Sequence, residues 1–121
     1  KVTNLTDVSE ITCVVQKGMA DEIVQSLLDA GIQGATVHSG VGTGIRERMG
    51  LLGVAVEVER EIVQVLVSKD QVDRIFERMY LAGRLDTPGM GYIYAAPLVQ
   101  AATYIPAHLL EDKDSLSSLG V

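Results

Sequence analysis

The apolar and polar positions of the chain follow a pattern that occurs twice. Segment Val14–Gly31 aligns with Leu66–Gly83 at an offset of 52 residues, and the apolar positions match better than the identities do. In each copy a short run rich in β-branched residues precedes a longer amphipathic stretch; these runs are Ile11–Val15 and Ile62–Val67. The pattern therefore predicts two copies of a strand followed by a helix.

Both amphipathic stretches place apolar residues at i, i+3, i+4, i+7 and i+8, which is one stripe of an α-helix. The first stripe consists of Ala20, Ile23, Val24, Leu27 and Leu28, and the second of Val72, Ile75, Phe76, Met79 and Tyr80. Each stretch ends in Ala-Gly. Helices commonly end at a glycine in the left-handed conformation, so we expect that conformation at Gly31 and at Gly83.

Further segments complete the predicted fold. Strands are expected at Ala35–Ser39, at Val54–Val58 (the beginning of a long third strand that continues through Val67) and at Tyr92–Ala96, with Pro97 at a strand end. The order βαββαβ predicts an α+β protein with the ferredoxin-like split βαβ fold, a four-stranded antiparallel sheet with both helices on one face. The other face also carries Val and Ile, so we expect an oligomer that covers it.

The length of 121 residues predicts a single domain, which we place at residues 11–110. Residues 1–10 are polar and form either a disordered arm or an extra edge strand. Between Thr103 and Leu110 we expect a short helix or strand that packs on a neighbour. Residues 111–121 are acidic and rich in serine, which is typical of a solvated tail.

Composition argues against several classes of function. Hydrophobic residues make up 47% of the chain and aromatic residues only 4%, so we expect an aliphatic core. The formal net charge of −6 disfavours nucleic acid or an anionic membrane surface as the main partner. No apolar run approaches the roughly 20 residues of a membrane-spanning helix. The single cysteine, Cys13, cannot form an internal disulfide and is expected in the core. We therefore expect a cytoplasmic protein without membrane insertion.

Two glycine-rich segments break the regular pattern. The first, Gly40–Gly50, carries glycines at positions 40, 42 and 44, followed by Arg46 and Arg48. Such glycines let backbone N–H groups approach an anion, and the guanidinium groups suit phosphate or carboxylate. The alternative is a flexible hairpin in which the arginines pair with nearby acids, namely Glu47, Glu57 or Glu59.

The second segment, Ala82–Tyr92, has the composition of a loop that cradles phosphate, with three glycines, Arg84 and Thr87. It does not match the Walker pattern, because no Lys-Ser or Lys-Thr pair follows the glycines. The alternative is an ordinary helix-to-strand connection with a turn at Pro88-Gly89. If edge strands of two subunits pair, the two glycine-rich segments could meet in a cleft at the interface.

Candidates for catalysis and metal binding are few. His38 and Ser39 are neighbours on one predicted strand, so their side chains point to opposite faces and cannot form a dyad. No Cys or His lies at ligand spacing from His38 or from the other histidine, His108. Three acidic residues share one strand face as a solvated rim: Glu57, Glu59 and Glu61. We predict no catalytic residue and no metal site.

Three motifs carry a family resemblance over most of the chain, from about Ile11 to Ile105. They are Gly31-Ile-Gln-Gly-Ala-Thr-Val37, Gly42-Thr-Gly44 and Gly83-Arg…Gly89-Met-Gly-Tyr-Ile…Pro97-Leu. Together they resemble the P-II family of nitrogen-regulatory signal-transduction proteins. The resemblance implies a ferredoxin-like homotrimer that binds adenine nucleotides in clefts between subunits. It also implies that a loop between the second and third strands changes shape and docks on a transporter, an enzyme or a regulator.

The resemblance assigns nucleotide-binding roles to individual residues. Thr36 and Gln64 would hold the adenine base. Gly42, Thr43 and Gly44 would lie at the root of the moving loop, from which Arg46 would reach the phosphates. The remaining residues would form the phosphate-side loop: Gly83, Arg84, Thr87, Gly89, Met90 and Gly91.

The chain departs from the family pattern in ways that affect the ligand. The loop from Gly44 to Val54 is short and has no Tyr or Ser, so the uridylylation or serine phosphorylation of the family has no acceptor here. Tyr92 stands where the family usually has a lysine, and no Lys or Arg occurs from Leu85 through Glu111. A triphosphate would be poorly neutralised, whereas a mono- or diphosphate needs less positive charge.

The sequence thus favours a regulator that binds AMP, ADP or ATP as an effector, has no tightly bound cofactor, and controls a partner such as a transporter or metabolic enzyme. Two alternatives stay open. One is a ferredoxin-like trimer that binds no nucleotide, and the other is an enzyme that slowly hydrolyses nucleotide in the same cleft. The glycine pairs Gly42/Gly44 and Gly89/Gly91 favour a ligand site, because a trimer without ligand does not need them.

Overall fold

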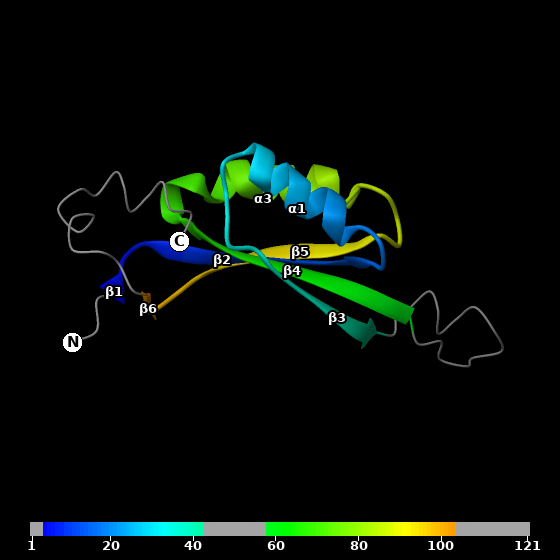
Figure 1. Ribbon diagram of the computed structural model, residues 1–121, viewed down its shortest axis with the longest axis horizontal. Helices are drawn as coiled ribbons and strands as arrows, with labels where there is room; N and C mark the ends of the chain where they lie inside the picture. Colours follow the sequence, from blue (N-terminus) through cyan, green and yellow to red (C-terminus); the bar gives the residue numbers. More distant parts are fainter. Residues whose placement is uncertain (1–3, 43–57, 104–121) are drawn as a thin grey trace.

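Both α-helices of the described part of the chain lie on one face of a four-stranded antiparallel sheet (Figure 1). The computed structural model describes residues 4–42 and 58–103. The elements in chain order are β1 (Asn4–Leu5), β2 (Val8–Gln16), α1 (Ala20–Asp29), β3 (Thr36–Gly42), β4 (Val58–Ser68), a 3-10 turn (Lys69–Gln71), α3 (Val72–Ala82), β5 (Gly91–Pro97) and β6 (Ala101–Ala102). The predicted α+β fold, with two helices on one face of this sheet, is confirmed.

The four long strands lie in the order β3-β4-β2-β5, so the first and third predicted strands are central. In this register Cys13 lies opposite Val63 on one side and Ile93 on the other. β2 begins at Val8, three residues before the predicted start. β5 ends at Pro97, and at this terminal position the missing backbone N–H of proline removes no hydrogen bond between strands. The predicted beginning of the third strand, at positions 54–57, lies outside the described residues.

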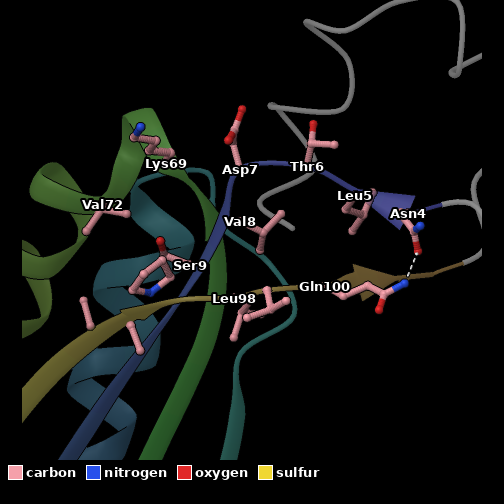
Figure 2. Close-up of a pocket in the computed structure, with 14 residues that line it drawn as sticks. Asn4, Leu5, Thr6, Asp7, Val8, Ser9, Lys69, Val72, Leu98 and Gln100 are labelled. Carbon is pink, nitrogen blue, oxygen red and sulfur yellow. Dashed lines mark hydrogen bonds between the residues drawn. The ribbon is translucent and has the colours of Figure 1, made fainter.

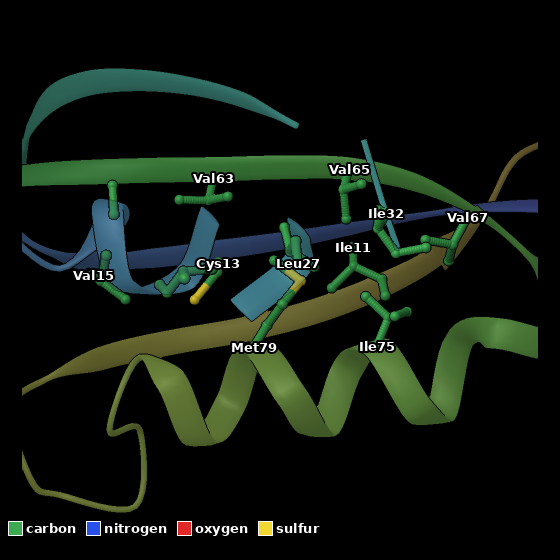
Figure 3. Close-up of a cluster of buried hydrophobic side chains, with 12 residues drawn as sticks. Ile11, Cys13, Val15, Leu27, Ile32, Val63, Val65, Val67, Ile75 and Met79 are labelled. Atoms are coloured by element: carbon green, nitrogen blue, oxygen red, sulfur yellow. The ribbon is translucent and has the colours of Figure 1, made fainter. Parts of the chain in front are cut away.

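An aliphatic core fills the space between the helices and the two central strands (Figure 3). Strand side chains alternate between faces, and those that face the helices are Ile11, Cys13, Val15, Val63, Val65 and Val67. The helices bury Ile23, Leu27, Ile75 and Met79 against them. Cys13 is buried, as predicted, and burial raises the pKa of its thiol to about 11. This thiol is therefore part of the core.

The predicted apolar stripe of the first helix is wrong at one position. Leu28 is 51% exposed, whereas Ala20, Ile23 and Leu27 are buried. Each residue turns an α-helix by about 100°, so Leu28 points well away from Leu27. α1 therefore contacts the sheet and α3 along a narrower line than the sequence pattern suggests.

The two helices end differently although both end in Ala-Gly. Gly31 has a φ of +82°, so the expected left-handed conformation is confirmed there. The same expectation is wrong for Gly83, which has a φ of −81°; the next residue, Arg84, takes the left-handed conformation with a φ of 55°. The surroundings of Gly83 are tight: a Cβ atom there would lie 3.2 Å from the Met79 carbonyl oxygen and 3.3 Å from Ile23 Cδ1, so these neighbours would have to shift by a few tenths of an ångström.

The two ends of the described chain meet in a small second sheet, in which β1 pairs antiparallel with β6. The side-chain amide of Gln100 donates a hydrogen bond to Asn4 Oδ1 at 3.2 Å. A strand within residues 1–10 is thus present, but it belongs to this second sheet. The expectations for residues 104–121 lie outside the described part of the chain. Neither α1 nor α3 is long and apolar enough to cross a membrane, and no other α-helix occurs among the described residues.

Candidate functional site

The connection from α3 to β5, which we call the glycine loop (residues 83–91), is a continuous series of turns. Backbone hydrogen bonds run from Thr87 N–H to the Arg84 carbonyl at 3.0 Å and from Met90 N–H to the Thr87 carbonyl at 3.3 Å. Arg84, Gly89 and Gly91 all have positive φ. The structure therefore brings together all the residues of the predicted phosphate-side loop in one compact segment.

Gly91 fixes this loop against the end of β2. Its φ is +136°, and a Cβ atom built on it would lie 1.9 Å from the Val14 carbonyl oxygen. Only glycine allows so close a backbone approach. A glycine at this position is therefore required for the loop to turn directly into β5.

A second attachment comes from Gln16, the last residue of β2. Its side-chain amide donates a hydrogen bond to the Gly89 carbonyl at 3.1 Å. Gln16 is the Cα partner of Arg60 on β4, and Arg60 is the partner of Gly40 on β3. The glycine loop thus lies at the same end of the sheet as Gly40–Gly42 and the basic residue Arg60.

Arg60 and Gln16 are missing from the residues singled out by sequence. A signal for Arg60 was present, because it alternates with Ile62 and Gln64 on one side of a predicted strand. Gln16 gives no comparable signal, because its contact with Gly89 joins segments 73 residues apart.

Thr36 and Gln64, the residues predicted to hold the base, are direct Cα partners on β3 and β4. The side chain of Gln64 is also engaged by His38, whose Nε2 lies 2.9 Å from Gln64 Oε1. His38 pairs with Ile62 and Ser39 with Glu61, so these neighbours lie on opposite faces as predicted. The structure thus groups Thr36, His38 and Gln64 on the face away from the helices, which we call the open face.

The two groups of predicted site residues lie apart within one chain. Thr36 is on β3, at one edge of the sheet, and the glycine loop leads into β5 at the other edge, with β4 and β2 between them. Three strand spacings of about 4.8 Å separate these edges by roughly 14 Å. Gly42 pairs with Val58 at the end of β3, whereas Thr43, Gly44, Arg46 and Arg48 lie outside the described residues.

The turn between β2 and α1 is fastened to the first residues of β4. Lys17 Nζ lies 2.8 Å from Glu59 Oε2, and this pairing lowers the pKa of Glu59 and raises the pKa of Lys17. Glu61 Oε1 accepts hydrogen bonds from the backbone N–H groups of Gly18 and Ala20. The expectation of a solvated rim is therefore wrong for Glu61, which is half-buried and caps α1. Glu57 lies outside the described residues.

Arg84 is the cation of the glycine loop. Its Nη2 atom lies 4.0 Å from Glu22 Oε1 on α1, at the limit of an ion pair, and both side chains are largely exposed. Exposed pairs of this kind are weak, so an anion could displace Glu22 at little cost.

Cavities lie at both ends of the sheet. A small one of about 240 Å³ is lined by Lys17, Ser39, Gly40, Glu59 and Arg60, near the ends of β3 and β4. A larger one of about 800 Å³ lies at the opposite end, where β1, the start of β2 and the residues after β5 come together (Figure 2). Its lining is mostly apolar and includes Val8, Val72 and Leu98. The large cavity is therefore separate from the glycine loop.

Within residues 4–42 and 58–103, no group of three or more His, Cys, Asp or Glu side chains is placed to hold a metal ion. The cationic side chains described at this end of the sheet are those of Lys17, Arg60 and Arg84.

The sheet order, the helices on one face and the glycine-rich turn before an edge strand define an α+β protein of the ferredoxin-like class. Residues 8–106 match the family model of the nitrogen regulatory protein P-II, so the chain belongs to the P-II family, as its motifs suggest. The crystal structure of Arabidopsis thaliana PII bound to citrate has the same fold, with a TM-score of 0.60 and 23% identity over 76% of this chain and 78% of that chain. No curated protein matches the sequence significantly.

Proposed function

We propose that this P-II family member is a homotrimeric regulator that binds a small adenine nucleotide between subunits and controls a partner protein. The observation that carries this proposal is the glycine loop. Gly91 allows the loop backbone to lie close to the Val14 carbonyl of β2, and the Gln16 side-chain amide donates a hydrogen bond to the Gly89 carbonyl. A loop held in this way has a fixed backbone, which lowers the entropy lost when a ligand binds to it.

The need for a second subunit follows from the distance between the two parts of the site. Thr36 and Gln64 lie toward one edge of the sheet and the glycine loop toward the other. The open face also leaves Tyr92 and Tyr94 exposed on β5. A trimer that covers the open face would bring the β5 edge of one subunit's sheet to the β3 edge of the next subunit's sheet.

The chemistry of this site suits reversible binding. Arg84 supplies positive charge on the glycine loop, and Arg60 supplies positive charge at the same end of the sheet. A regulator works by binding its effector more tightly in one conformation, which the partner then recognises. We place it in the cytoplasm, with a transporter or a metabolic enzyme as partner, rather than assigning it an enzymatic activity of its own.

Citrate is a second candidate effector, since the Arabidopsis PII structure contains it. It is a compact anion, and arginines that suit a phosphate also suit carboxylates. Citrate lacks a base, however, so it would make no use of Thr36 and Gln64.

The test is a thermal-shift panel with AMP, ADP, ATP, cyclic AMP and citrate, each with and without magnesium. A ligand that binds only the folded protein stabilises it by about 2.7 kcal/mol at 100 times its dissociation constant. We expect stabilisation by an adenine nucleotide, and sedimentation should give three times the 13.0 kDa mass of one chain.

Two arginine variants locate the site. Arg84→Gln should weaken the nucleotide shift, whereas Arg78→Gln should leave it unchanged, because Arg78 on α3 donates to the Ser26 carbonyl. An intact trimer that no nucleotide stabilises at millimolar concentration would contradict the proposal. A shift with citrate alone would favour the second effector.

A further inference from the structure

The large cavity is lined mostly by apolar side chains that the described part of the fold leaves uncovered (Figure 2). Its volume is about 800 Å³, many times the roughly 30 Å³ that one water molecule takes up in the liquid. Val99 in its lining is 105% exposed, and Leu5, Val72 and Leu98 are half-buried. Removing such apolar surface from water is favourable in proportion to its area. An apolar segment that filled this cavity would therefore stabilise the protein.

Part of the lining lies on the helix side of the sheet. Ile11 faces the helices, and Ser9 lies on the same face two residues earlier. Ala95 and Pro97 on β5 are the Cα partners of these two residues. Ser9, Ala95 and Pro97 line the cavity, as does Val72 at the start of α3. A trimer that covers the opposite, open face does not by itself fill this side of the cavity.

One of the chain segments outside the described residues begins beside this cavity. The segment 43–57 joins β3 to β4 at the other end of the sheet, and the 11 residues of β4 separate it from the cavity by roughly 33 Å. Residues 1–3 are too few to fill so large a space and include one apolar side chain, Val2. The C-terminal segment, by contrast, starts at residue 104, four positions after Gln100 in the cavity lining.

The first seven residues of this C-terminal segment have the composition of a buried stretch. Residues 104–110 contain no Asp, Glu, Lys or Arg, and five of them are apolar or aromatic: Tyr104, Ile105, Ala107, Leu109 and Leu110. Charged residues begin abruptly at position 111 with Glu-Asp-Lys-Asp. Seven extended residues span up to about 23 Å, which is long enough to turn back over the cavity. Because the segment is tethered next to its site, its effective concentration there is roughly millimolar or higher.

The small sheet beside the cavity gives a second reason for an occupant. β1 and β6 have two residues each, and an isolated pair of such short strands is at best marginally stable in water. Leu5 of β1 is half-buried and lines the cavity. A segment packed in the cavity would cover Leu5 and hold β1 against the rest of the fold.

We propose that residues 104–110 turn back after β6 and occupy the large cavity of their own chain. Ile105, Leu109 and Leu110 supply the apolar side chains that cover the lining, and the charged residues from Glu111 onward stay in solvent. The cavity is thus the docking site of the C-terminal segment. This docking goes beyond the proposed function and does not depend on nucleotide binding.

A nitroxide label at position 111 tests the docking by NMR on the assembled full-length protein. Cys13 is the single cysteine of the chain and is buried, so a thiol label reacts with Glu111→Cys and spares Cys13. The unpaired electron broadens the signals of nearby amides. We expect broadening at Leu5, Val72 and Leu98, and none at Gly40 at the other end of the sheet. Broadening that is absent at the cavity, or equal at both ends of the sheet, would overturn the proposal.

Mixed samples show whose segment fills the cavity. Isotope-labelled chains without the nitroxide are unfolded and refolded together with unlabelled chains that carry it, so broadening can come only from another subunit. We expect little broadening at the cavity in this sample. Broadening as strong as that from a nitroxide on the same chain would place the segment in a neighbouring subunit and overturn the assignment to its own chain.

A polar version of the segment tests its energetic role. In the triple variant Ile105→Ser, Leu109→Ser and Leu110→Ser, hydrogen exchange of the β1 and β6 amides should accelerate by about tenfold or more. The same substitutions should abolish the broadening by the nitroxide at the cavity and increase the binding of a dye that fluoresces in apolar sites.

The matched control changes the acidic residues that follow the segment. Asp112→Asn with Asp114→Asn should leave hydrogen exchange, broadening and dye binding as in the wild type. Unchanged exchange and dye binding in the triple variant would overturn the proposal. If the triple variant does not fold, the nitroxide measurement still decides, because it leaves residues 104–110 as they are.

Discussion

The carboxylate of Glu61 on β4 accepts a hydrogen bond from the backbone N–H of Ala20, the first residue of α1, at 3.2 Å. The residue that precedes the helix, Met19, makes no capping hydrogen bond with its own side chain. A helix start leaves N–H groups without an intrahelical acceptor and favours negative charge. A carboxylate from a strand 41 residues away therefore replaces the local cap.

Removing this distant cap should destabilise the fold. Glu61→Ala should lower the free energy of unfolding by about 1 kcal/mol, the usual effect of losing an N-cap. Glu61→Gln should lose less, because its amide oxygen still accepts a hydrogen bond. Urea unfolding at fixed protein concentration measures both. Glu59→Ala is the control on the same strand face, and a loss as large as that of Glu61→Ala would contradict the capping role.

Gly91 should tolerate substitution less well than Gly31. At Gly91 an alanine would combine an unfavourable φ with a Cβ atom 1.9 Å from the Val14 carbonyl oxygen, so β5 must move. We expect Gly91→Ala to cost roughly 3 kcal/mol or more. Gly31→Ala meets open space and should cost only the left-handed strain, about 1 kcal/mol. Equal shifts of the urea midpoint would show that the close approach at Gly91 is unimportant.

The Lys17–Glu59 pair should contribute a pH-dependent stabilisation. The pKa of Glu59 is lower in the folded protein, so its contribution is present above the ordinary carboxyl pKa and is lost as pH falls through the folded pKa. The pKa of Lys17 is raised above 10.5, so its contribution is lost as pH rises through that higher value. Glu59→Gln should therefore be slightly less stable than wild type near neutral pH and equal to it in strong acid. A difference that grew on acidification would have the wrong sign.

The thiol of Cys13 should be unreactive in the folded protein. It is buried and its pKa is raised to about 11, so little thiolate forms at pH 8. Under native conditions a disulfide reagent should label Cys13 only as fast as the fold opens around β2. In urea, where the protein is unfolded, it should label Cys13 rapidly. Rapid stoichiometric labelling under native conditions would show that β2 is open to solvent there.

Much of the fold could be predicted because its signals are local. The repeated strand and helix patterns around Ile11–Val15 and Val72–Tyr80 depend on spacing along the chain, and the structure keeps them. The different ends of the helices could not be predicted from the shared Ala-Gly. Gly83 lies where an added Cβ would meet the side chains of Ile23 and Val15, which is a tertiary constraint, and the left-handed conformation falls on the next residue, Arg84.

The candidate site, too, could be predicted only in part. The glycine loop is contiguous in sequence, so its residues could be chosen together. The side chains that position or supplement it come from elsewhere: Gln16 bonds to Gly89, and Arg60 enters only through the register of β2 and β4. That register is set by burial of one strand face, and spacing alone does not reveal it.

The central claim is the location of the ligand, and amide NMR shifts during a titration of the assembled protein with AMP test it most directly. The account predicts that the shifts concentrate in the glycine loop and at Thr36 and Gln64. Shifts concentrated instead around the large cavity at the other end of the sheet, at Val8, Val72 and Leu98, or no shifts at saturating AMP, would contradict it.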